Sequence, residues 1–186
     1  METLKTLLQS KFKTIALVAM ALAFSSLILM LRIKLNSSFF YLFLVWNIFL
    51  ATIPYALTLY LKTKQNLSPL KLGFWFLVWL AFLPIAPYIV TNLIHIRSGY
   101  GTFLWLDILV ILSFALSGVI LFYYSITEMQ QLIISRFKRI PIKTATLVIL
   151  FLCGFGVYLG RFLRYNSWEI ISQPQLLILD IIAILI

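Results

Sequence analysis

The residues best suited to chemistry stand at the ends of long apolar stretches. His95 is the only histidine of the chain and could serve as an acid, a base or a ligand. Asp107 and Glu169 are the carboxylates that could work with it, so these three residues are the weak catalytic candidates. Simpler explanations are also open, namely His95 as an interfacial residue at a helix end and Asp107 in a structural salt bridge to an arginine.

A second group of polar residues is suited to binding an anion. Arg161 and Arg164 are three residues apart, and arginine offers a planar donor fork that suits phosphate or carboxylate. The same pair could instead snorkel to the interface and cap the negative end of a helix dipole. Because the polar side chains come from three segment ends on the same deduced side of the membrane, we expect a pocket there. Its expected binding residues are Asn92, His95, Asp107, Arg161, Arg164 and Asn166.

The segment before His95 contains two prolines, Pro84 and Pro87. Prolines three residues apart break or kink a helix. After the expected kink, polar residues recur at spacings of three and four, which predicts that they share one α-helical face. These residues are Tyr88, Thr91, Asn92 and His95.

The composition indicates that these residues belong to a membrane protein. The 186 residues are 63% hydrophobic and 11% charged, with a mean hydropathy of +1.06, whereas soluble domains are about 45–50% apolar and about 25% charged. A soluble fold of this size cannot bury so much apolar surface. The net charge of +10 lies in short clusters between apolar runs, which argues against a nucleic-acid partner. With one cysteine, Cys153, and one histidine, no disulfide and no metal site are indicated, and no cofactor is expected.

Five apolar stretches have roughly the 20 residues that a helix needs to cross the bilayer. Their continuous apolar character indicates helices rather than the alternating strands of a barrel. The sequence therefore predicts an all-α, polytopic transmembrane helix bundle that forms one domain, residues 1–186. The expected spans are residues 14–31, 39–61, 72–96, 103–124 and 144–160, followed by a short apolar segment, 174–186, that is partial or interfacial.

The distribution of Lys and Arg gives the orientation in the membrane. Ten of the 15 basic residues lie at the N-terminus and in the even-numbered loops, which places these parts in the cytoplasm. The basic loop of residues 136–143 suits contact with anionic lipid on that side. The first stretch follows three lysines as a signal peptide does, but it lacks a clear small-residue cleavage site, so we interpret it as a retained helix.

Three blocks of the chain resemble the small bacterial integral membrane proteins of domain of unknown function 1361. These blocks are residues 45–51 with Pro54 and Tyr55, residues 82–95, and residues 156–168, and Trp105 to Asp107 also fits the pattern. The resemblance spans residues from about 40 to about 170. It implies a multi-pass protein of the bacterial plasma membrane and supplies no activity.

Two positions depart from the pattern of that family. Ile85 stands where the pattern has an asparagine, and Asn92 stands where it has an aspartate. Acid–base or cation chemistry that depended on those positions would be lost or changed in this chain. Members of the family also run on into a further hydrophobic helix, so we expect this chain to be short at its C-terminus.

Three functions fit these features. The first is a binding or assembly protein whose outer-face pocket holds an anionic lipid headgroup or an acidic segment of a membrane-protein partner, and a homo-oligomer is compatible with it. The second is a membrane-embedded enzyme acting on a lipid-linked substrate, for which the sequence shows no recognised nucleophile or metal motif. The third is a small transporter. This function is less favoured, because the chain has only five expected spans and no charged residue at the predicted midplane. The lipid bilayer is the one partner that all three require.

Overall fold

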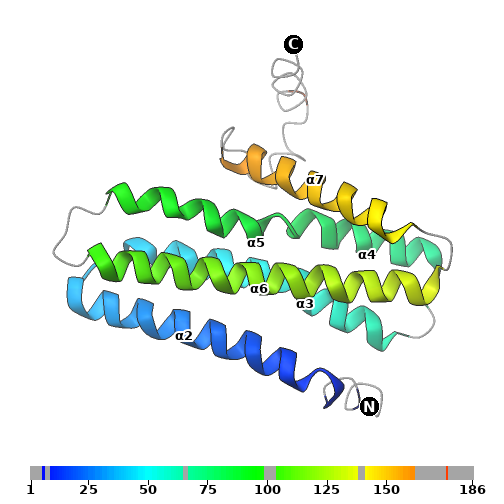
Figure 1. Ribbon diagram of the computed structural model, residues 1–186, viewed down its shortest axis with the longest axis horizontal. Helices are drawn as coiled ribbons and strands as arrows, with labels where there is room; N and C mark the ends of the chain where they lie inside the picture. The colour runs from blue at the N-terminus through cyan, green and yellow to red at the C-terminus, as the bar shows by residue number, and fades with distance from the viewer. Residues whose placement is uncertain are drawn as a thin grey trace.

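The structure is a computed structural model that describes residues 6, 9–64, 67–98, 104–137, 141–161 and 175. Nearly all of these residues are helical, and the described ranges contain no strand. Five helical spans are long and apolar enough to cross a membrane, and they run back and forth along one long axis (Figure 1). The predicted all-α membrane bundle is therefore confirmed. The expected apolar segment at residues 174–186 lies outside the described part of the chain, apart from residue 175.

Each predicted stretch falls on one helical span, with one large difference in length. In chain order the elements are α2 (Phe12–Asn36), η1 (Phe40–Leu42), α3 (Phe43–Thr63), α4 (Pro69–Phe82), α5 (Ile85–Tyr88), η2 (Ile89–Ser98), α6 (Leu104–Arg136) and α7 (Ile142–Arg161). The sequence predicts that the fourth span ends at residue 124, but α6 continues to Arg136. The reason is that Glu128 and Gln130, which read as the start of a loop, bond to neighbouring helices instead.

The long helix α6 is the centre of the bundle. In its most apolar stretch 56% of the residues are buried, against 17–33% in the other four spans. It packs against α2 and α3 on one side and against α5 and η2 on the other. The helix α7 lies at the edge of the bundle and meets α5 and α6 (Figure 1). The surfaces of the outer helices that do not face α6 are rich in exposed apolar side chains, as lipid contact requires.

The predicted break at the prolines is present. Helix α4 ends at Phe82, Pro84 follows in a turn, and only the four-residue α5 precedes the 3₁₀-helix η2. A 3₁₀-helix has three residues per turn, so Asn92 falls in line with Ile89, and both are buried. Thr91 lies in a different row and is half-buried. The expected single α-helical face of polar residues is therefore wrong for this segment, because the helix changes its period after the prolines.

Two glycines allow close packing around this break. A Cβ atom on Gly118 of α6 would lie 2.7 Å from the backbone oxygen of Ala86, and one on Gly156 of α7 would lie 2.8 Å from Cγ of Pro84. Real Cβ atoms do not approach so closely, so these positions hold the proline turn between α6 and α7. The close approach of α7 to Pro84 therefore depends on Gly156, whereas Gly154 has no atom within 4 Å of such a Cβ.

Candidate functional site

Asp107, a predicted site residue, forms an ion pair at one end of the bundle. Nε of Arg32 lies 2.8 Å from Oδ1 of Asp107, and both residues are buried. Nη1 of Arg32 also donates to the backbone oxygen of Ser38 at 3.0 Å, and the guanidinium lies 4.7 Å from the centre of the Tyr41 ring. Asp107 therefore has a partner within the protein, which favours the structural explanation over a catalytic or ligand-binding one.

A second buried acid, Glu128, lies near the opposite end of α6. Nζ of Lys11 is 2.7 Å from its Oε1, and Nζ of Lys62 contacts its Oε2. Lys62 also donates to Oε1 of Gln131 at 2.8 Å. Lys11 precedes α2 and Lys62 belongs to the last turn of α3, so one carboxylate joins three helices.

Both acids of α6 are paired with basic residues of the α2 segment, and the two acids are as far apart in sequence as their two basic partners. Lys11 and Arg32 are 21 residues apart, as are Asp107 and Glu128. At 1.5 Å per residue this is about 32 Å, close to the roughly 30 Å thickness of the hydrocarbon core. The two ion pairs therefore mark two levels, here named the Asp107 end and the Glu128 end, whose separation matches the thickness of a hydrocarbon core. Between them the hydroxyls of Ser25 and Ser117 hydrogen-bond at 3.0 Å.

Asn92 is the most deeply buried of the predicted binding residues that the structure describes. It is 1% exposed, and its Nδ2 donor has no hydrogen-bond partner in the described structure. The hydroxyl of Tyr55 on α3 is the other described buried polar atom without one. Leaving a buried donor unpaired costs about 1–3 kcal/mol, which makes Asn92 a position to explain by function or by strain.

Arg161, the last residue of α7, lies near the same depth as η2. Gly156 touches Pro84, and α7 runs in the same direction as α5 (Figure 1). Five residues further along α7 is about 7.5 Å, which brings Arg161 level with the beginning of η2. Arg161 is half-buried there. Gly118 of α6, next to Ser117, meets Ile89, so the beginning of η2 lies about midway between the two ion pairs. Asn92, three residues further along η2, lies between this level and the Asp107 end.

The other predicted site residues cannot be placed with them. His95 belongs to η2, but its side chain lies outside the described part of the structure. Arg164, Asn166 and Glu169 also lie outside the described residues. Their convergence with Asn92 stays a prediction.

Four residues of the buried ion pairs were not predicted as a site from the sequence. From the sequence, Lys11, Arg32 and Lys62 count only among the basic residues that give the orientation, and Glu128 has no assigned role. One signal in the sequence could have indicated these pairs. An acid inside an apolar helix is costly to bury, so it predicts a basic partner on a neighbouring helix. Among the described residues, no three His, Cys, Asp or Glu side chains come close enough to hold a metal ion.

The spans and their buried polar contacts define a multi-pass α-helical membrane protein. Residues 46–186 match a family model described as "Protein of unknown function (DUF1361)", so the chain belongs to this family, as the resemblance indicates. No curated protein and no solved structure matches the chain. The matched residues begin inside α3, so Asp107 and Glu128 lie within the match and Lys11 and Arg32 lie before it.

Proposed function

We propose that this protein is a multi-pass protein of the bacterial plasma membrane that binds an anionic lipid headgroup at the Asp107 end. The N-terminus then lies in the cytoplasm and the Asp107 end faces outward. The placement of basic residues supports this orientation, because Lys11, Lys62, Lys64 and Arg136 all lie near the Glu128 end. Basic residues of membrane proteins are concentrated on the cytoplasmic side.

The observation that carries the proposal is the unpaired amide of Asn92. Its Nδ2 is a buried donor that needs an acceptor, and the oxygens of a phosphate are strong acceptors. Arg161, the last residue of α7, lies at the end of this helix that points toward the Asp107 end, and it supplies positive charge. Asp107 is already neutralised by Arg32, so its carboxylate does not oppose an anion at this end.

The same contacts make the two alternative functions less suitable. An enzyme with Asp107 as its acid or base would have to break a buried ion pair before every proton transfer. A transporter needs polar groups near the midplane that can exchange partners. Midway between the two ion pairs, the hydroxyls of Ser25 and Ser117 are bonded to each other. A binding role requires neither change.

Native mass spectrometry of protein extracted from membranes that contain phosphatidylglycerol tests the proposal. We expect the parent to carry a lipid adduct that the Arg161→Ala/Arg164→Ala variant and the Asn92→Leu variant lose. Leucine has the same number and branching of side-chain heavy atoms as asparagine and removes the unpaired donor, so the second variant is expected to stay folded.

The matched control is Lys13→Ala/Lys34→Ala, which removes the same charge from exposed positions on α2. This control should keep the adduct. An adduct with the mass of a peptide or protein would instead identify an acidic partner segment. Equal adducts on the parent and on both site variants would contradict the proposal.

A further inference from the structure

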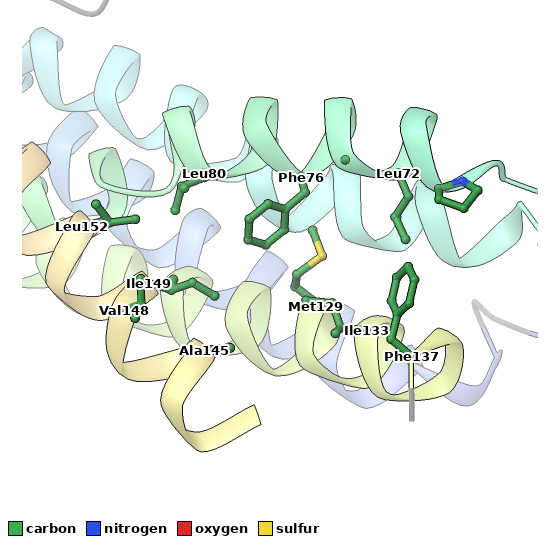
Figure 2. A pocket seen from close by; sticks show the side chains of 12 residues that line it. Leu72, Phe76, Leu80, Met129, Ile133, Phe137, Ala145, Val148, Ile149 and Leu152 are labelled. Atoms are coloured by element: carbon green, nitrogen blue, oxygen red, sulfur yellow. The ribbon is translucent and has the colours of Figure 1, made fainter. Parts of the chain in front are cut away.

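An apolar groove lies at the other end of the bundle, where α4, α6 and α7 meet. It has a volume of about 340 Å³, within the range of ligand pockets. Every residue that lines it is apolar or glycine. Figure 2 shows side chains of α4 facing those of α6 and α7 across the groove. They include Leu72 and Phe76 of α4, Met129 and Ile133 of α6, and Val148 and Ile149 of α7.

The depth of the groove fits an amphiphile rather than a fully apolar molecule. Met129 follows Glu128 directly, and Phe137 lies eight residues beyond Met129, so the groove crosses the level of the ion pair at the Glu128 end. Toward the centre of the bundle it reaches Leu80 and Leu152. One part of an occupant would therefore lie at hydrocarbon depth, and the other part would lie at the level of the lipid headgroups.

Two lysines flank the mouth of the groove at the first turns of α4 and α7. Lys71 and Lys143 are exposed and lie within two residues of the lining residues Leu72 and Ala145. Both belong to the first turns of α4 and α7, where the helix dipole also favours an anion. Glu128, the acid described near this level, is already shared by Lys11 and Lys62.

We infer that this groove holds one acyl chain of an anionic glycerophospholipid, with the phosphate beside Lys71 and Lys143. The apolar lining accounts for the chain, and the basic mouth accounts for the anionic headgroup. The lipid belongs to the leaflet on the side of the N-terminus. This site is separate from the one proposed at the Asp107 end, and neither depends on the other.

Two glycines supply a matched pair of variants for the acyl-chain part of the site. Gly73 lines the groove, whereas Gly154 on α7 does not, and a Cβ at either position would have no atom within 4 Å. The leucine of Gly73→Leu therefore meets no clash at its Cβ and can occupy the groove, and Gly154→Leu adds the same side chain elsewhere. Both replace glycine inside a helix by a better helix former, so neither is expected to unfold the protein.

The test uses the full-length protein in phosphatidylcholine vesicles that contain phosphatidylglycerol with a photoreactive diazirine in one acyl chain. After illumination, labelled peptides are mapped by mass spectrometry. We expect labelling of the groove to exceed labelling of the exposed face of α7 around Leu147 and Phe151. Gly73→Leu should reduce groove labelling by about tenfold, the effect of about 1.4 kcal/mol of binding free energy, and Gly154→Leu should not.

The headgroup part is tested by charge. Lys71→Gln/Lys143→Gln should reduce the preference for phosphatidylglycerol over a phosphatidylcholine probe, by about fivefold for each lysine. The control Lys13→Gln/Lys34→Gln on α2 should leave that preference unchanged. The inference is overturned if the parent labels equally with both probes, or if Gly73→Leu has no effect. It is also overturned if groove labelling is no higher than on the exposed face of α7, as would follow if residues 174–186 or a second copy filled the groove.

Discussion

The two ends of the interface between α2 and α6 are built from the same kind of contact in different surroundings. At the Asp107 end one arginine meets one aspartate, and the side chains are 8% and 6% exposed. At the Glu128 end two lysines share one glutamate. The glutamate side chain is 3% exposed, but those of Lys11 and Lys62 are 25% and 15% exposed. The first contact is a closed, neutral pair, and the second has surplus positive charge that reaches water.

This difference indicates that the two ends differ in how rigidly they hold the helices together. The Arg32 guanidinium is fixed by Asp107, the Ser38 carbonyl and the Tyr41 ring, so it sets one geometry. A lysine is a point charge on a flexible stem, and two of them can share or exchange one acid. We conclude that the Asp107 end fixes the position of α2, whereas the Glu128 end is adaptable. The basic groove mouth lies at this adaptable end.

The largest expected effect comes from breaking the closed pair. Arg32→Met leaves Asp107 buried without a cation, so the free energy of unfolding should fall by about 3–5 kcal/mol. The measurement is reversible unfolding in mixed micelles with increasing SDS. The double variant Arg32→Met/Asp107→Leu replaces the pair by apolar side chains and should recover most of the loss. A double variant as unstable as Arg32→Met would show that the arginine acts through other contacts.

Breaking the adaptable end should cost less. Glu128→Gln removes the charge but keeps a hydrogen-bond acceptor, and the two lysines can turn toward water. We expect a loss of about 1.5–3 kcal/mol, the value of hydrogen bonds to a charged group. The difference from the parent should also shrink in 1 M salt, where exposed charges are screened, while that of Arg32→Met should not. A loss larger than that of Arg32→Met would contradict the comparison.

Much of the fold follows from the sequence, because long apolar runs in lipid have one stable conformation. Five helical spans were predictable from length and hydropathy alone. Pro84 predicted the break in the third span. The length of α6 was not predictable in this way. Glu128 and Gln130 look like the polar end of a span, and only their partners Lys62 and Thr146 on other helices keep them inside the bundle.

The buried ion pairs were harder to predict, because they depend on which helices are neighbours. Hydropathy and charge say that Arg32 lies at a helix end, and they do not say that α2 packs on α6. One signal was available in the numbering. Two bases and two acids each 21 residues apart, on segments of opposite direction, match each other if the two helices are neighbours. The unpaired amide of Asn92 had no such signal, since its burial depends on the 3₁₀ geometry of η2.

The smallest expected effect lies midway between the two ends, at the bond between Ser25 and Ser117. Each hydroxyl also lies within reach of a backbone oxygen of its own helix, Ala21 for Ser25 and Ser113 for Ser117. Removing one serine therefore leaves the other with an acceptor, and Ser117→Ala should cost only about 0.6 kcal/mol, the average for such bonds in membranes. A double-mutant cycle with Ser25→Ala measures the coupling. A coupling as large as that between Arg32 and Asp107 would mean that the whole interface, and not its ends, holds α2 in place.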